Sequence, residues 1–196
     1  MRDYLDMFFK LIEEQTRGIY VRDIIMIILV ALLLLVIAKA VMLIKGEDIS
    51  RTHMLLTFWT IVYAGLLLLI TFFRRESGSR GGEIQIRLNL GSLTGGWYMI
   101  KQAAYSILNV ILFIPWGFLL RFKRIEDGFI KAVFMTTLMG FLTSFTIELF
   151  QLVTKRGIFE ITDLVTNVSG TVIGAVIASA IILYSTKKQE KDNEQE

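Results

Sequence analysis

The chain has 196 residues, of which 54% are hydrophobic and only 20% charged, and its mean hydropathy is +0.60. A soluble domain of this length needs more surface charge, and it cannot hide several long apolar segments in one core. The composition therefore predicts an integral membrane protein. With no cysteine and one histidine, disulfide frameworks and zinc sites built from Cys and His are excluded. A net charge of +3 is typical of basic membrane loops and does not indicate a nucleic-acid partner.

The first predicted element is an amphipathic helix over residues 1–17. Leu11 and Ile12 fall on one helical face and charged residues occupy the others, as in a helix that lies in the membrane interface. Two apolar segments follow, at 24–44 and 52–73. Each has about the 20 residues that a helix needs to cross roughly 30 Å of hydrocarbon, so both are predicted to span the membrane.

Between the second and third spans, residues 83–90 alternate polar and apolar side chains, as in a short strand. We expect this segment to be extended and to act as a lid. Three further apolar segments, at 103–120, 130–153 and 163–184, bring the predicted spans to five.

These elements predict an all-α fold, namely a polytopic transmembrane helix bundle of about five spans with the interfacial helix and the lid attached. Residues 1–184 are expected to form one integral-membrane domain, and 185–196 a charged cytoplasmic tail. Alternating spans place the N-terminus, the lid loop and the loop 154–162 on one side, here called side A. Basic residues are denser in the short loops of the opposite side B, which predicts the N-terminus outside and the C-terminus inside a bacterial cytoplasmic membrane.

Polar side chains gather near the side A ends of the last three spans. An ionisable group inside the bilayer costs about 2.5 to 3.5 kcal/mol on insertion scales, so Glu148 is the residue most in need of a role. Asn109 and Asp163 fall at a similar depth, which predicts a shallow polar cleft. Glu148 and Asp163 are the candidate catalytic residues. The candidate ligand-binding residues are Asn109, Ser144, Glu148, Gln151, Arg156, Asp163 and Asn167.

Small residues predict how the last three spans pack. On the fourth span, Gly140 shares one helical stripe with Ser144 and Glu148. On the fifth, Gly170 and Gly174 form a GxxxG pattern, which lets two helices approach closely. The simplest packing sets these two stripes face to face. In the third span, Pro115 is expected to bend the helix just beyond Asn109.

Three segments resemble the VanZ family of bacterial membrane proteins. They are the run from Asn109 through Pro115 to Leu120, the run from Ser144 to Gln151, and the run from Arg156 through Asp163 and Asn167 to Gly174; together they lie within residues 105–178. The family tends to have an acidic pair where this chain has Thr162-Asp163, and an Asp where it has Glu160. The resemblance implies a small envelope protein, in a family named for a member that gives low-level resistance to the glycopeptide teicoplanin.

Three functions from different classes remain open. The favoured one is a protein that binds or shields an amphiphilic envelope ligand at an outer-leaflet polar cleft, with membrane lipids, a lipoglycopeptide or a lipid-linked cell-wall precursor as partner. The second is an intramembrane enzyme that modifies a lipid-linked headgroup, with Glu148 as general acid or base. The third is a small transporter or proton path. No cofactor is predicted, although Glu148 and Asp163 together offer oxygen ligands for a divalent cation; the oligomeric state stays open.

Overall fold

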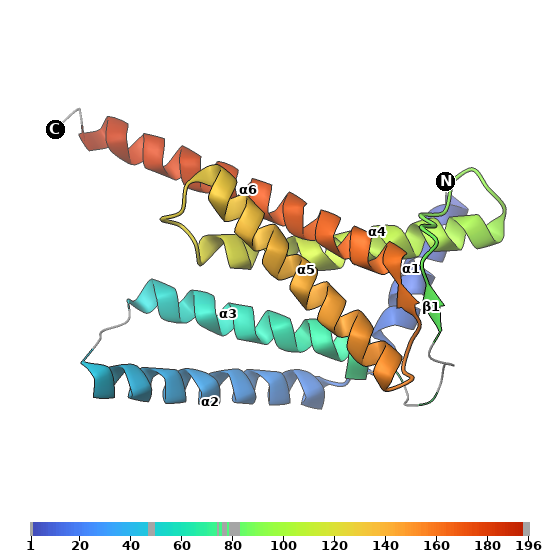
Figure 1. Ribbon diagram of the computed structural model, residues 1–196, viewed down its shortest axis with the longest axis horizontal. Helices are drawn as coiled ribbons and strands as arrows, with labels where there is room; N and C mark the ends of the chain where they lie inside the picture. The colour runs from blue at the N-terminus through green and yellow to red at the C-terminus, as the bar shows by residue number, and fades with distance from the viewer. Residues whose placement is uncertain (1, 47–49, 74, 76–77, 79–82, 194–196) are drawn as a thin grey trace.

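The computed structural model describes residues 2–46, 50–73, 75, 78 and 83–193. Within these residues five helices are long and apolar enough to cross a membrane, which confirms the predicted all-helical bundle of five spans. In chain order (Figure 1) the elements are α1 (Arg2–Thr16), α2 (Val21–Lys45), α3 (Arg51–Leu68), the π-helical turn η1 (Leu69–Phe73), β1 (Ile84–Gln85), α4 (Trp97–Phe122), α5 (Phe129–Val153), β2 (Phe159–Glu160) and α6 (Ile161–Asn193).

Two of the spanning helices extend well beyond their predicted bounds. α4 begins at Trp97, directly after its Gly96 N-cap, rather than at residue 103. α6 continues to Asn193 through the segment expected to be a charged tail. The sequence after Gly174 contains no further glycine or proline up to that point, and its Lys, Glu and Gln residues favour a helix. Pro115 lies inside α4, which runs through it as one continuous helix.

Glycines bring α6 into close contact with α4. A Cβ atom at Gly170 would collide with the carbonyl oxygen of Val110, and one at Gly174 with that of Ile114. In return, a Cβ at Gly117 of α4 would collide with the carbonyl oxygen of Thr171. These helices therefore pack backbone against backbone, as the GxxxG pattern predicts.

The predicted face-to-face packing of the α5 and α6 stripes is wrong for Gly170 and Gly174. Both glycines face α4, whereas Gly140 of α5 approaches the side chain of Thr171 on α6. The reason is geometric, because consecutive helical residues point about 100° apart and α6 contacts two neighbours on adjoining faces. Gly140, Gly170 and Gly174 are thus packing residues that serve two different interfaces.

The helices α2 and α3 lie side by side along the rest of the bundle (Figure 1). Of the described α2 side chains only Ala31 is buried, and most of the others are apolar, which suits a helix that faces lipid. α3 joins the bundle through a buried apolar cluster that includes Leu67, Phe113 and Ile147. The Tyr63 hydroxyl donates a hydrogen bond of 2.7 Å to the carbonyl oxygen of Leu112, which ties α3 to α4 beside Pro115.

The side B end of the bundle is fixed by a buried arginine. Arg121 is 2% exposed, and its Nε donates to Ser179 Oγ of α6 at 2.7 Å while Nη1 donates to the Arg124 carbonyl oxygen at 2.6 Å. Asp127 in the same loop accepts from Lys131 at 2.8 Å and from Arg124 at 2.9 Å. These hydrogen bonds, first that of Lys131 and then that of Arg124, hold the pKa of Asp127 below its ordinary value.

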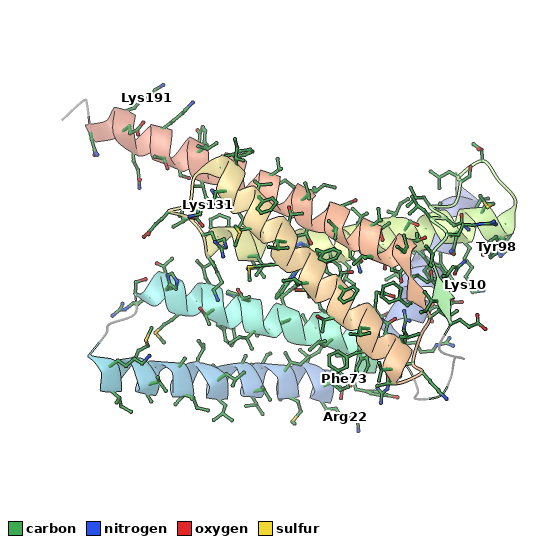
Figure 2. The ribbon with its side chains drawn as sticks, in the orientation of Figure 1. Lys10, Arg22, Phe73, Tyr98, Lys131 and Lys191 are labelled. Atoms are coloured by element: carbon green, nitrogen blue, oxygen red, sulfur yellow. The ribbon has the colours of Figure 1, made fainter. Side chains whose placement is uncertain are left out.

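The side A end gathers segments that are far apart in sequence. α1, the sheet and the first turns of α4 and α6 lie together there, opposite the C-terminal end of α6 (Figure 1). Figure 2 shows Lys10 and Tyr98 at this end and Lys131 and Lys191 at the other. Leu11 of α1 is buried and packs against Ala104 of α4. The predicted helix is therefore confirmed, but its apolar Leu11 contacts protein.

The predicted extended segment pairs with a partner that the sequence did not indicate. β1 and β2 form a parallel two-stranded sheet in which Ile84 is opposite Phe159 and Gln85 is opposite Glu160. The remaining alternating residues form no strand, and Ile86, Leu88 and Leu90 are exposed. This sheet links the segment between η1 and α4 to the start of α6.

Candidate functional site

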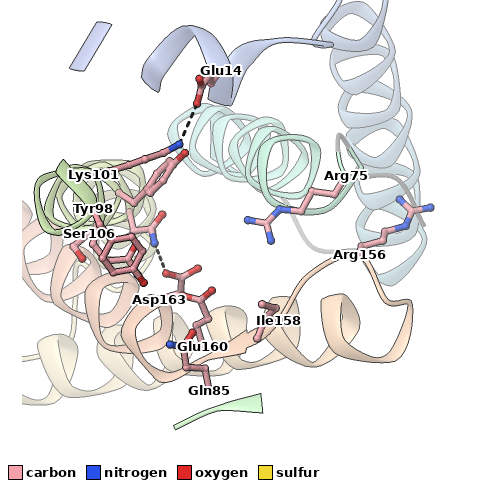
Figure 3. A pocket seen from close by; sticks show the side chains of 13 residues that line it. Glu14, Arg75, Gln85, Tyr98, Lys101, Ser106, Arg156, Ile158, Glu160 and Asp163 are labelled. Atoms are coloured by element: carbon pink, nitrogen blue, oxygen red, sulfur yellow. Dashed lines mark hydrogen bonds and ion pairs between the residues drawn. The ribbon is translucent and has the colours of Figure 1, made fainter. Parts of the chain in front are cut away.

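A polar cavity of about 740 Å³ opens at the side A end of the bundle (Figure 3). Its walls come from α1, Arg75 between η1 and β1, β1 itself, the N-terminal half of α4, the loop after α5, β2 and the start of α6. Among the described residues that line it, every one except Ile158 carries a polar or charged group. A cavity of this size is in the range that holds a small organic molecule or a lipid headgroup.

α4 and α6 meet in the cavity through two residues that the sequence analysis singled out. Asn109 donates from Nδ2 to Asp163 Oδ1 at 2.9 Å. Arg156, in the loop before β2, also lines the cavity. Thus three of the predicted ligand-binding residues lie on one surface.

The other four predicted residues form a buried layer behind that surface. Ser144, Glu148, Gln151 and Asn167 are all at most 4% exposed and are not among the lining residues. Asn167 donates from Nδ2 to Ser144 Oγ at 2.9 Å, which joins α5 to α6. The structure therefore brings these polar side chains together on α5 and α6 and separates them from the open cavity.

Within this layer, Glu148 and Gln151 hold parts of the cavity wall. Glu148 Oε2 accepts a hydrogen bond of 3.0 Å from the backbone N–H of Glu160, so it fixes strand β2. Gln151 donates from Nε2 to the Thr71 carbonyl oxygen at 3.0 Å and accepts from Arg75 Nη1 at 3.0 Å. Both residues thus position cavity residues that come from other segments.

Several lining residues were missed by the sequence analysis. Tyr98, Gln102 and Tyr105 precede Asn109 at helical spacings of 4, 3 and 4 and form one stripe along α4. The spacing could have predicted that these residues share one helical face with Asn109. It was not used because the third span was predicted to begin only at residue 103. Arg75 carried no such signal, since it follows an apolar span in a loop rich in glycine and basic residues.

The described part of the cavity lining is balanced in charge. Its cations are Arg75, Lys101 and Arg156, and its carboxylates are Glu14, Glu160 and Asp163. Lys101 Nζ lies 4.0 Å from Glu14 Oε2 at the α1 side. Such a lining can bind a polar group through charge-assisted hydrogen bonds, with the cations as donors and the carboxylates as acceptors. Among the described residues, no group of three or more His, Asp or Glu side chains is arranged to hold a metal ion.

Comparison with known proteins places the chain in a family. The family model VanZ/LLP1 matches residues 24–183, which include most of the five apolar helices and all cavity-lining residues except Glu14. No curated protein and no solved structure matches the chain. The matched region spans most of the sequence, and it contains the three segments in which the resemblance was seen. This multi-pass membrane protein therefore belongs to the VanZ/LLP1 family.

Proposed function

We propose that this protein binds the polar headgroup of an amphiphilic envelope molecule in the side A cavity and so holds or shields it. The observation that carries the proposal is the polar cavity of about 740 Å³ at one end of an apolar bundle. A headgroup fits among its charged and amide side chains, while acyl chains can lie against exposed apolar side chains such as Ile107 and Trp97 of α4.

In this proposal the cavity faces the outside of a bacterial cytoplasmic membrane. The denser basic residues of the short side B loops support an outer N-terminus and an inner C-terminus. The partners are membrane lipids, and a lipoglycopeptide such as teicoplanin or a lipid-linked cell-wall precursor. The resemblance to the VanZ family supports a contribution to low-level teicoplanin resistance, since an acylated glycopeptide combines a polar head with an apolar tail.

The geometry supports binding better than catalysis through Glu148. A general acid or base must reach the proton that it transfers. Glu148 is 1% exposed, and its Oε2 already accepts the backbone N–H of Glu160. Asp163 does line the cavity, but one of its oxygens accepts from Asn109. These two carboxylates are better suited to holding the cavity in shape than to proton transfer on a ligand.

The geometry also gives less support to a transport path. Along α4 the lining of the side A cavity ends at Asn109, and the lining of a second cavity at side B begins at Trp116, roughly 10 Å further along the helix. Phe113 lies between them and is fully buried in the apolar cluster. The two cavities are thus separated by apolar side chains rather than joined.

Teicoplanin susceptibility tests the proposal in cells that express each variant at a matched protein level. We expect Asp163→Asn and Arg75→Gln to lose most of the protection that the wild type gives, because each removes a charge from the cavity. One charge-assisted hydrogen bond is worth about tenfold in affinity. Glu83→Gln is the control, because Glu83 is exposed and does not line the cavity. Equal protection by all four proteins would show that the cavity is not the functional site.

A further inference from the structure

A second cavity, of about 640 Å³, opens at the side B end of the bundle. It lies between the N-terminal half of α3, the C-terminal end of α4 with the loop that follows, and α5. Figure 1 shows the start of α3 and the loop between α4 and α5 at this end of the bundle. The described linings of the two cavities share no residue, so the side B cavity can take a ligand of its own.

The lining of this cavity has an outer and an inner level. α3 runs away from side B and α4 runs toward it, so His53 near the start of α3 lies at about the depth of Lys123, the C-cap of α4. Thr60 and Trp116 each lie seven residues, or roughly 10 Å, further into the bundle. Spacings of 4 and 3 place Trp116, Leu120 and Lys123 on one face of α4. The cavity therefore extends from the end of the bundle to the depth of the acyl chains.

The outer level carries an excess of positive charge. The segment from the last turn of α4 to the first turn of α5 contains four cations and two carboxylates. One carboxylate, Asp127, already accepts from Lys131 at 2.8 Å and from Arg124 at 2.9 Å, and the other, Glu126, is exposed. Within the described part of the chain, Lys123 forms no ion pair. Basic pockets of this kind between spanning helices are suited to anionic lipid headgroups.

The inner level is mostly apolar and holds one donor that needs an acceptor. Leu120 and Met139 line it, and Met139 is exposed, so the cavity adjoins the outer apolar surface of α5. Thr60 donates its hydroxyl proton to the carbonyl oxygen of Leu56 at 2.6 Å. Trp116 is 8% exposed, and its buried Nε1, which can only donate, has no acceptor among the residues that the structure describes. An apolar ligand segment that carries an oxygen acceptor would suit this level.

We infer that the side B cavity binds one anionic phospholipid from the leaflet on that side. The phosphate lies against Lys123 and Arg124, which donate charge-assisted hydrogen bonds to it. The glycerol ester oxygens lie deeper, near Trp116, and the acyl chains pass Leu120 and Met139 toward the surrounding lipid. A phospholipid has its charge at one depth and its ester oxygens and apolar chains below, as the two levels require, whereas a soluble phosphate would use only the outer level.

Quenching of Trp116 fluorescence by brominated lipids tests the inference. The chain has three tryptophans, and Trp59 and Trp97 are both exposed, so changing these two to Phe leaves Trp116 as the only reporter. The purified full-length protein is placed in phosphatidylcholine vesicles that contain an increasing fraction of lipid with brominated acyl chains. We expect brominated phosphatidylglycerol to reach half of its maximal quenching at a mole fraction about tenfold lower than brominated phosphatidylcholine, whose choline ammonium offsets its phosphate.

Substitutions of Lys123 in this reporter protein locate the headgroup. Lys123→Gln should raise the half-quenching fraction of phosphatidylglycerol about tenfold and leave that of phosphatidylcholine unchanged, whereas Lys123→Arg should keep the preference. Lys187→Gln is the matched control, because Lys187 is exposed on α6 toward the same end and does not line the cavity. An unchanged elution volume and thermal unfolding midpoint establish that the effect of Lys123→Gln is local.

Three results would overturn the inference. The first is an equal half-quenching fraction for the two lipids, which is the behaviour of lipid that merely surrounds the bundle. The second is a Lys123→Gln protein that keeps the full preference for phosphatidylglycerol. The third is recovery of Trp116 fluorescence by inorganic phosphate beyond the effect of sodium chloride at equal ionic strength, which would identify a soluble anion as the ligand. None of these results bears on the proposed function, because the side A cavity has a separate lining.

Discussion

Gly174→Ala should prevent most of the protein from accumulating in a folded form. The added Cβ would collide with the carbonyl oxygen of Ile114 and lie 2.8 Å from the backbone nitrogen of Phe118. Both are backbone atoms of α4, which cannot rotate away as a side chain can. Overpacking of this kind costs about 1 to 3 kcal/mol or more, against a total stability of about 5 to 15 kcal/mol for a typical domain. The yield of monodisperse protein after detergent extraction measures the effect.

Gly96→Ala is the matched control for this substitution. Gly96 caps α4, its backbone conformation is open to alanine, and a Cβ there meets nothing within 4 Å. Alanine is also favoured over glycine in a helix by about 1 kcal/mol. A loss of stability in Gly174→Ala would therefore mean that the collision costs more than this gain in helix propensity. Equal yields and equal thermal unfolding midpoints for the two variants would contradict the close packing of α4 and α6.

Glu148→Ala should loosen the wall of the cavity and abolish headgroup binding, whereas Glu148→Gln should retain both structure and binding. Alanine leaves the partly buried backbone N–H of Glu160 without its acceptor, which costs about 1 to 3 kcal/mol, and it also removes packed side-chain atoms. Glutamine keeps a carbonyl oxygen that can accept the same hydrogen bond. Hydrogen exchange across residues 156–160, measured together with lipid binding, reports both effects.

This pair of variants also separates a structural role for Glu148 from a catalytic one. If Glu148→Gln folds and binds like the wild type, a hydrogen-bond acceptor is all that the position requires. A Glu148→Gln protein that is folded, shows unchanged exchange at Glu160 and yet loses all cellular activity would instead require an ionisable carboxyl group. That outcome would support the intramembrane enzyme.

The sequence predicted the helices well because lipid imposes a simple rule on them. A spanning helix needs a long apolar run, and each such run became a helix within a few residues of its predicted bounds, as α5 shows. The exceptions are two helix ends, where polar residues made the helix look shorter than it is. The first turns of α4 carry Tyr98, Lys101 and Gln102, which line a cavity rather than face lipid, and the last turns of α6 carry charges suited to water.

The interhelical contacts were less predictable, because a stripe of small residues does not show which neighbouring helix it contacts. Gly170 and Gly174 lie against the backbone of α4, and the choice between α4 and α5 as their partner depends on how these two helices are arranged around α6. Arg121 illustrates the same limit at side B. Its sequence position is typical of a basic loop residue, and only the fold shows that it is buried against Ser179.

In the candidate site, the depth of each residue along its helix was predictable, but the contacts of its side chain were not. Counting residues from the span ends placed Asn109 and Asp163 at one level, and they are hydrogen-bonded. The same count could not tell that Glu148 turns toward the backbone of Glu160, nor that Arg75 reaches Gln151 from a segment 76 residues away. Such contacts depend on strand β2 and on the loop after η1, which have almost no sequence pattern.

Protection of a single cysteine in the cavity tests the central claim most directly, because the chain has no cysteine of its own. Ile158→Cys places a thiol in the cavity lining, and Thr94→Cys places one on an exposed loop outside it. Teicoplanin should slow maleimide labelling of the cysteine at 158 several-fold and leave labelling at 94 unchanged. Equal labelling rates at 158 with and without teicoplanin would contradict a headgroup site in this cavity.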